Sequence, residues 1–483
     1  MLALTLILIP FIGSILLFLL KGSNVSTSKN VALFSSLITF AVAIYTFATF
    51  NPLVPIEAKY TWMKDLNINF HIGIDGISLL MIALTTFLVP IIILSTYKFS
   101  YKNHATFYML ILLTEVALLG VFMAKDIFLF YFFFEAALIP VYFLAAIWGG
   151  KDAPRITFKM FVYTIFGSLF MLVAIVYLYI QGATVNIQEL YTTGKLISPT
   201  NQNLLFWAFF IAFAIKMPVL PFHTWQPDAY SESPTPATML LSGLLSKMGV
   251  YGLIRILLPL APIGVTNWGF FGMILSVIGL IYGSIIAIQQ NNIKRLIAYS
   301  SFAHMGLMAA GVLSGTLSGI QGALLQMVAH GINAVGLFFI IKIIYDRTNT
   351  RELSALGGIT QKTPALSIYF MIIMLGSVAL PLTNGFVGEF LLLKSVYDKN
   401  VWLGAIAGLT IILGAVYMLR LMQRSMFGES NQVTAKFKDV SGTEVAVLLP
   451  LAILVVLMGV FPNIFLKITE PAVNSILQII SSK

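Results

Sequence analysis

Several ionisable residues of this 483-residue chain lie within apolar stretches of the sequence, and six of them are candidates for chemistry. A charge at the centre of a lipid bilayer costs at least a few kcal/mol, so such residues are functional candidates by default. They are carboxylates, lysines and histidines, and the chain contains no cysteine. This set excludes thiolate catalysis and cysteine-ligated iron–sulfur clusters and favours proton transfer. The candidates are Glu135, Lys216, Lys247, His304, His330 and Glu389.

The combination of buried lysines with buried carboxylates has a direct chemical meaning. A lysine in a medium of low dielectric loses affinity for its proton, and a nearby carboxylate restores that affinity. Moving the carboxylate therefore switches the lysine between holding and releasing a proton, without a metal or a nucleophile. The alternative is a static ion pair that only orients helices. Structural or interfacial roles are the simpler interpretation of Arg255 and Lys394, and the role of Glu115 stays open.

Two of the histidines are predicted to lie at equal depth on neighbouring helices. His304 and His330 are each thirteen residues from a predicted turn near Leu317. Such a pair could ligate a haem, or it could relay protons because the pKa of histidine is close to neutral. A buried histidine with satisfied hydrogen bonds is the third possibility. A relay gains support from Lys247 and Glu389, which could flank the pair in one polar file.

Composition determines the elements that position these residues. Hydrophobic residues make up 59% of the chain and charged residues 10%, against about a quarter charged residues in a soluble domain. The apolar runs last about 18–25 residues, which suits helices across a ~30 Å hydrocarbon core, and they lack the alternation of barrel strands. The sequence predicts an all-α integral membrane protein with about fourteen transmembrane helices, near residues 2–20, 31–50, 77–97, 106–124, 126–147, 157–180, 204–221, 235–260, 267–289, 294–313, 317–343, 363–397, 401–426 and 443–461.

The seventh and twelfth of these helices are predicted to be broken. Pro218 and Pro221 interrupt one, and Pro381 with Gly385 interrupts the other. Interrupted helices are tolerated where the freed backbone lines a polar cavity, and in transporters they mark the pathway. The spacing fits two inverted five-helix repeats. We expect four parts: N-terminal helices 1–3, a first repeat of helices 4–8, a second repeat of helices 9–13, and helix 14 with an interfacial tail, over residues 1–104, 105–260, 261–426 and 427–483.

Charge indicates orientation rather than a nucleic-acid partner. The net charge is +10, but the cations are dispersed over short loops. Most of them adjoin the ends of odd-numbered helices, and the side richer in lysine and arginine is expected to be cytoplasmic. Both termini then face outward. The first apolar run lacks a basic leader and a cleavage site, so we expect a retained first helix rather than a signal peptide.

The motifs around these residues resemble those of the antiporter-like subunits of respiratory complex I. The resemblance covers roughly residues 70–460 and is most specific in a few stretches. These are Glu135 with its aromatic approach and Pro140, Lys216 followed by Pro-Phe-His-Thr-Trp (221–225) and Pro227-Asp228, Lys247-Met-Gly, and Lys294-Arg295-Leu-Ile-Ala-Tyr-Ser-Ser with His304-Met-Gly. Tyr230 is a departure, because the family pattern has histidine after Pro-Asp-Ala, and it puts in doubt a proton role for that loop.

The resemblance implies a proton-translocating membrane-arm subunit of an NADH–quinone oxidoreductase. It implies no cofactor in this chain; NADH, FMN, iron–sulfur clusters and quinone are expected in partner subunits. The expected partners are other membrane-arm subunits, especially the sister antiporter-like subunits L and N, and lipid. It implies that Glu135 and Lys216 form an input pair and that Lys247 is the central lysine. It further implies that His304 and His330 are relay residues and that Glu389 is the outlet acid.

Alternatives stay open at this point. The sister subunits and the corresponding antiporter subunit usually carry lysine at the outlet, so Glu389 favours complex I over a multi-subunit sodium/proton antiporter. It does not exclude a membrane-bound hydrogenase. We expect location in a bacterial plasma (inner) membrane, with an organelle inner membrane as the alternative.

Overall fold

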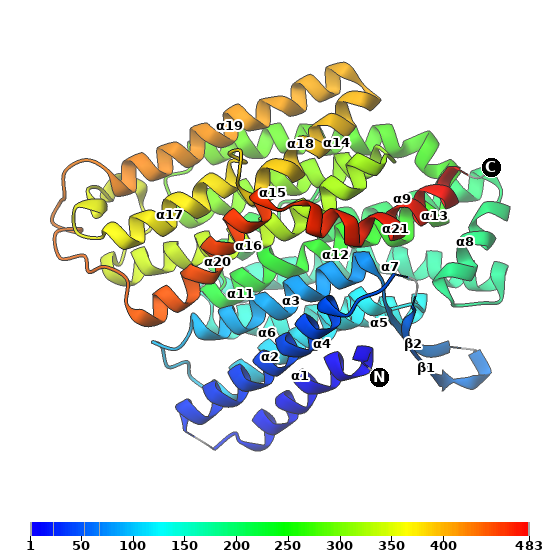
Figure 1. The fold of residues 1–483 in the computed structure, drawn as a ribbon, viewed down its shortest axis with the longest axis horizontal. Coiled ribbons are helices and arrows are strands. Elements are labelled where there is room, and N and C mark those ends of the chain that lie inside the picture. Colours follow the sequence, from blue (N-terminus) through cyan, green and yellow to red (C-terminus); the bar gives the residue numbers. More distant parts are fainter. Residues whose placement is uncertain (1, 23, 53, 67, 482–483) are drawn as a thin grey trace.

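The computed structural model describes residues 2–22, 24–52, 54–66 and 68–481, which form a bundle of long helices (Figure 1). Within these residues, twelve segments are long and apolar enough to cross a bilayer by length and composition. They are α1 (Leu2–Leu19), α2 (Val25–Ala48), α3 (Gly76–Leu94), α4 (His104–Met123), α5 with α6 (Ile127–Ala136 and Leu138–Trp148), α7 (Ala153–Gly182), α11 to α13 (Thr235–Leu240, Lys247–Gly252 and Leu258–Leu260), α14 (Pro262–Gln289), α15 (Ile293–Leu313), α16 (Leu317–Thr348), α19 (Val401–Met426) and α20 (Gly442–Val460).

Two further spans are broken in the middle. One consists of α9 (Pro199–Lys216) and the short α10 (Gln226–Glu232), and the other of α17 (Pro364–Ser377) and α18 (Asn384–Lys399). Together with the twelve continuous segments they give the predicted all-α membrane fold of about fourteen spans, which is confirmed. The broken span is the fourth member of the group of helices 4–8 and also of helices 9–13, as two five-helix repeats require. The predicted division into four parts stays a prediction.

One end of the bundle carries a small sheet and two surface helices, and we call it the hairpin end. It consists of the antiparallel strands β1 (Ile56–Met63) and β2 (Ile68–Ile74), α8 (Ile187–Leu196) and α21 (Asn463–Ser481). Isolated bridges join Ile72 to Ala124 and Asp126 to Asn186, and so tie the sheet to the turn after α4 and to the start of α8. Both ends of the drawn chain lie on this side, at the right of Figure 1.

The opposite end holds the loops rich in lysine and arginine, and we call it the basic end. It includes the connections after α3, α6, α14, α16 and α19. Three short helical turns lie in the connections at the two ends: η1 (Lys64–Leu66) in the hairpin, and η4 (Leu353–Ala355) and η5 (Ile359–Gln361) at the basic end. The second span begins at Val25, earlier than the sequence predicts, because Lys29 lies inside α2 with its Nζ donating to the Tyr97 carbonyl at 2.8 Å.

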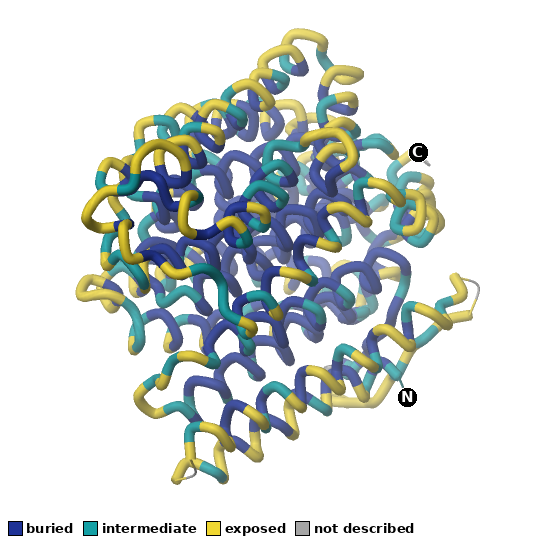
Figure 2. The backbone as a smooth tube through the Cα atoms, turned by 60° about the vertical axis from the view of Figure 1, so that its left-hand side comes forward, coloured by how far each residue is buried: buried dark blue, intermediate teal, exposed yellow. Residues whose placement is uncertain are grey.

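The buried core lies along a few central helices. The segments from Thr235 to Leu260, α15 and α16 are each 94% buried over their most apolar window, against 33% for α2 and α19. In Figure 2 the exposed residues accordingly lie at the periphery of the molecule, and the buried residues lie in its interior. Three of the six candidate residues, Lys247, His304 and His330, are on these central helices and are buried.

Candidate functional site

Glu135 and Lys216 face each other from two interrupted helices. Glu135 is the penultimate residue of α5, which ends before Pro140 because a proline in the next turn removes a backbone donor. Lys216 is the last residue of α9 and is only 4% exposed. Its Nζ lies 4.9 Å from the centre of the Phe134 ring, and Glu135 is close enough to act on its charge. Among the described residues the two charged groups form no direct ion pair.

The break after Lys216 is a built turn rather than a disordered gap. Pro218 and Pro221 cannot continue the helix. The carbonyls that lose their helical donors are satisfied in other ways: the Val219 N–H donates to Ala214 at 2.7 Å, and the Trp225 indole Nε1 donates to Ile215 at 3.0 Å. The backbone around Lys216 is therefore fixed at a depth where an ordinary loop could not be tolerated.

Lys247 lies in a helix with two wide turns. The π-helical segments η2 (Leu241–Leu245) and η3 (Leu253–Leu257) flank it, and π-bulges frequently occur at functional sites. The lysine is fully buried; its Nζ donates to the Ser242 carbonyl and lies 3.4 Å from Ser246 Oγ. Its third neighbour is Nδ1 of His330, at 2.7 Å. The wide turn thus supplies a carbonyl acceptor to an amine that forms no ion pair with any of the residues that the structure describes.

The two histidines are adjacent, as their equal predicted depth requires. The ring centres of His304 on α15 and His330 on α16 are 5.6 Å apart. His304 Nδ1 is 2.8 Å from the Ser300 carbonyl, and its Nε2 is 3.1 Å from the Ser377 carbonyl. The second carbonyl belongs to the last residue of α17. The break in the twelfth span therefore provides a backbone acceptor to the relay histidine.

Glu389 completes a continuous file. Its Oε1 lies 3.1 Å from His304 Nε2, and the Glu389 side chain is 7% exposed. Gln326, on the same helix as His330, donates to the same oxygen at 3.3 Å. Glu389 follows the break, in the half of the span nearer the hairpin end. Four predicted residues, Lys247, His330, His304 and Glu389, thus form one chain of contacts from the core toward that end.

Some members of this file could not be found from the sequence. Gln326 and the Ser377 carbonyl are neither charged nor part of a motif, and only the fold brings them to Glu389 and His304. The structure does not join the Glu135–Lys216 pair to Lys247: in the described part of the chain no hydrogen bond or ion pair links them. Tyr230, which differs from the family pattern, is fully buried beside Gln226, Ser246 and Ser301. It therefore lies near the central lysine rather than at a surface.

The haem interpretation of the histidine pair does not fit this arrangement. Both ring nitrogens of His304 face protein oxygen atoms, and Nδ1 of His330 faces Lys247. A haem iron needs a free nitrogen from each ligand and an open plane between them. Among the described residues, no group of three or more histidine or acidic side chains could hold a metal ion. The geometry favours the relay.

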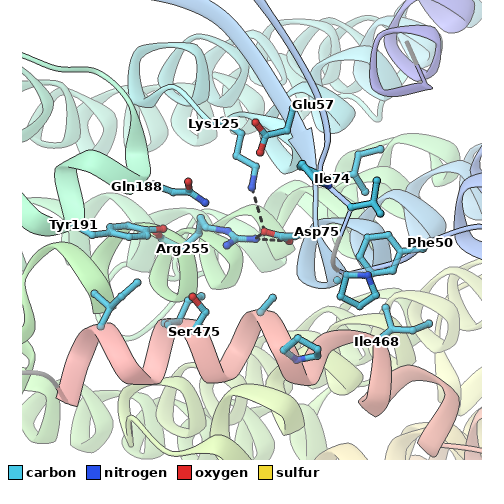
Figure 3. Close-up of a pocket in the computed structure, with 18 of the residues that line it drawn as sticks. Phe50, Glu57, Ile74, Asp75, Lys125, Gln188, Tyr191, Arg255, Ile468 and Ser475 are labelled. Atoms are coloured by element: carbon cyan, nitrogen blue, oxygen red, sulfur yellow. Dashed lines mark hydrogen bonds and ion pairs between the residues drawn. The ribbon is translucent and has the colours of Figure 1, made fainter.

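A second charged cluster lies at the hairpin end, in a cavity of about 460 Å³ beside α21. Arg255 and Lys125 both reach Asp75, which caps α3 (Figure 3). Burial acts to raise the pKa of Asp75, but Arg255, Lys125 and the backbone of Ser78 together bring it well below its usual value. Arg255 therefore pairs with an acid at a helix terminus, in a cluster of two cations and one carboxylate.

Comparison with known proteins identifies the family of the chain. The family described as NADH:quinone oxidoreductase/Mrp antiporter, transmembrane region, matches residues 124–414. The chain is 39% identical to NADH-quinone oxidoreductase subunit M of Rickettsia conorii, over 98% of this chain and 97% of that protein. It is 38% identical to NADH-ubiquinone oxidoreductase chain 4 of Marchantia polymorpha, over 98% and 96%.

Solved structures are similar over the whole chain. A chain of respiratory complex I from Thermus thermophilus with bound NADH superposes with a TM-score of 0.92 at 30% identity, covering 100% of both chains. A chain of the Mrp complex from Dietzia sp. gives a TM-score of 0.85 at 19% identity, covering 100% of this chain and 52% of that one. The second similarity is one of fold alone.

Proposed function

The chain belongs to the NADH:quinone oxidoreductase/Mrp antiporter family, and from that premise we propose that it is the proton-translocating subunit M of an NADH–quinone oxidoreductase. It is a multi-pass membrane protein whose buried lysines, carboxylates and histidines move protons while partner subunits reduce quinone. No redox chemistry is assigned to the chain itself.

The observation that supports this function most directly is the file from Lys247 to Glu389. Its two outer pairs are at hydrogen-bonding distance, 2.7 Å from Lys247 to His330 and 3.1 Å from His304 to Glu389, and the two imidazole rings between them are neighbours with centres 5.6 Å apart. The two imidazoles between them can each accept a proton on one nitrogen and release one from the other. A proton can therefore pass along the file through small rotations of the rings.

The input pair can gate this file electrostatically. An ammonium in a low-dielectric interior is stabilised by a nearby carboxylate. While Glu135 is near Lys216, the lysine holds its proton; when the carboxylate moves away, the ammonium is destabilised and releases it. Proton release by Lys216 removes a positive charge and so raises the proton affinity of Lys247. We assign Glu135 and Lys216 as the switch, Lys247 as the central carrier, and Glu389 as the outlet.

The assembly is part of the same proposal. The chain lies in the membrane arm against sister subunits, of which L and N are the expected neighbours, and NADH, FMN, iron–sulfur clusters and quinone belong to partner subunits. The location is the bacterial plasma membrane, or the inner membrane of an organelle, with the hairpin end and both termini outside. The distribution of basic residues supports this orientation.

A subunit of a sodium/proton antiporter, or of a membrane-bound hydrogenase, is the second candidate. The shared fold supports it. Two observations favour the quinone-reducing complex: identity of 39% over nearly the full length of a subunit M relative, against 19% to the antiporter chain, and a carboxylate at position 389.

A variant of the central lysine tests the function. Lys247→Met keeps an unbranched side chain but removes the proton-carrying amine, so we expect assembled complex in inverted membrane vesicles to lose NADH-driven vesicle acidification and most quinone reduction. Lys394→Gln is the control, because Lys394 pairs with Asp398 on an exposed face. Normal acidification by Lys247→Met, or purification without NADH- and flavin-binding partners, contradicts the proposal.

A further inference from the structure

Glu115 is a buried acid that the proposed file does not use. It lies in the middle of α4, is 0% exposed, and neither carboxylate oxygen has a hydrogen-bond partner in the described part of the molecule. Buried polar atoms are almost always paired, so an unpaired carboxyl group requires an explanation. An acid inside the membrane is, moreover, a functional candidate by default.

The depth of Glu115 matches that of the input acid. The turn between α4 and α5 contains Lys125, and Glu115 and Glu135 are each ten residues from it. Because α4 and α5 are antiparallel neighbours, two residues equally far from their turn lie at the same level. The Phe133 side chain of α5 is in close contact with Gly120 of α4, eight and five residues from Lys125, which agrees with this register to within about one turn.

The depth of Glu115 is also within about one turn of that of the central lysine. The Tyr251 hydroxyl donates to the Phe122 carbonyl at 2.8 Å, and the two rings pack edge to face. Both residues are on spans that run from the basic end to the hairpin end. Two turns earlier on α4 is Glu115, on the same face as Phe122. The equivalent step on the other helix reaches Leu244, about one turn from Lys247.

These positions put Glu115 on a helix that packs against the helix of the input acid and against that of the central lysine. α4 contacts α5, which carries Glu135, and α12, which carries Lys247. The space between the input pair and Lys247 is also where the contacts between described residues are interrupted. A carboxyl group with two unpaired oxygens in that region can bind bridging water, which a buried polar site commonly holds.

We propose that Glu115 is a proton carrier of the conduit, which holds a proton between the input pair and Lys247. The inference rests on the proposed function. An ionised carboxylate without a cation beside it is strongly unfavourable in the membrane, so the resting form is the neutral acid. In the transfer, the O–H proton of Glu115 passes to the neutral amine of Lys247 through water. The carboxylate that remains then takes a proton from the Lys216 ammonium, so that charge and protons balance.

Two substitutions separate this role from packing. Glu115→Gln keeps the size and polarity of the neutral acid but cannot release a proton, whereas Glu115→Asp keeps the acid and loses a methylene group. If Glu115 carries protons, Gln lowers NADH-driven acidification of vesicles by about tenfold or more, and Asp retains more activity than Gln. If Glu115 only fills space, the order is reversed. Glu470→Gln, at an exposed acid of α21, is the control.

Infrared difference spectroscopy provides a second readout on the assembled complex. The carbonyl stretch of a protonated carboxylic acid, shifted in D₂O, should be lost in Glu115→Gln and kept in the control. Wild-type pumping by Glu115→Gln overturns the inference. Lys247→Met is assayed in parallel: if it fails to pump while Glu115→Gln pumps normally, only the role of Glu115 is wrong, and if both pump normally, the proposed function is wrong as well.

Discussion

At the scale of single residues, a lysine near a carboxylate inside a membrane can hold helices together or move a proton. The two roles predict different outcomes when both charges are removed. A structural pair can often be replaced by apolar residues at little cost, since desolvation offsets most of the attraction. A proton switch cannot, because the titrating groups are the function. For Glu135 and Lys216 the packing of the ammonium against Phe134 is compatible with either role.

We predict that Glu135→Ala and Lys216→Ala each depress quinone reduction severely in fully assembled complex, because electron transfer is coupled to proton movement. The double apolar variant Glu135→Leu with Lys216→Met should not recover it. The measurement is NADH–quinone activity per assembled complex, together with vesicle acidification. Recovery of pumping in the double variant would show that the pair carries no proton.

For Asp75 we expect an effect on stability rather than on proton transfer, because its partners Arg255 and Lys125 have structural roles. We predict that Asp75→Asn costs about 3 kcal/mol of stability at neutral pH, since it leaves Arg255 and Lys125 without their shared carboxylate. The pKa of Asp75 is lowered in the folded protein, so this contribution is present above the pKa of the unfolded chain, about 4. It is lost as the pH falls through that value toward the lower pKa of the folded state.

The measurement is the temperature at which this subunit leaves the detergent-solubilised complex, for wild type and variant, from pH 7 downward. The difference between the two should be largest at neutral pH and should shrink below pH of about 4. Asp65→Asn, at an exposed residue of the hairpin, is the matched control. A difference that is independent of pH would mean that Asp75 acts through its shape and not its charge.

The charged members of the candidate site stood out in the sequence, whereas their neutral neighbours did not. Ionisable residues stand out in apolar surroundings, so Lys247 and Glu389 were found from the sequence alone. Gln326 did not stand out, because an amide in a membrane helix is common and its role depends on which helix lies opposite. Asp75 and Lys125 lie in loops, where charge is expected and carries no signal.

At the scale of elements, the breaks supply what the side chains need. Prolines and glycines predicted the interruptions after Lys216 and before Glu389. The π-helical turns around Lys247 could not be predicted, because Leu-Ser-Gly-Leu-Leu is also an ordinary helical sequence and the wide turn is chosen by packing. Close contact between α16 and α18 was equally hidden, although it is glycine that permits it: a Cβ at Gly322 would lie 2.9 Å from Leu391 Cβ.

This contact leads to a prediction for Gly388, whose added Cβ would lie 2.6 Å from Gln326 Oε1. We expect Gly388→Ala to push Gln326 away from Glu389 and to loosen the contact of Glu389 with His304, at a cost of about 1–3 kcal/mol for overpacking. Acidification should fall severalfold in complex that still assembles. Gly408→Ala, on α19 where nothing lies within 4 Å of the new Cβ, should leave it unchanged. Equal behaviour of the two variants would contradict a role for the α16–α18 contact.

At the scale of the whole molecule, the central helices that carry most of the proposed proton path differ from the helices around them. The helices that carry Lys247, His304 and His330 are enclosed by other helices, and the peripheral helices present apolar side chains outward. Hydropathy alone gave the number of spans, because each must cross the same hydrocarbon thickness. It could not give the neighbours of each span in space, since helices in lipid associate through local packing rather than through overall hydrophobicity.

The hairpin end and the basic end of the bundle differ in charge, and this difference predicts which end faces which compartment. The chain has no cysteine, so a single introduced thiol reports on one site without background. Thr61 is exposed on β1 at the hairpin end, and Ser100 is exposed in the loop after α3 at the basic end. If basic loops stay in the cytoplasm, Thr61→Cys should react with a membrane-impermeant maleimide in intact cells stripped of their outer membrane. Ser100→Cys should then react only after permeabilisation.

Since Glu389 lies on the hairpin side of its helix break, this labelling pattern also fixes the direction of the file, from the cytoplasmic half toward the outside. The reverse pattern would turn the proposed outlet into an inlet and would require the roles of Glu389 and the input pair to be exchanged.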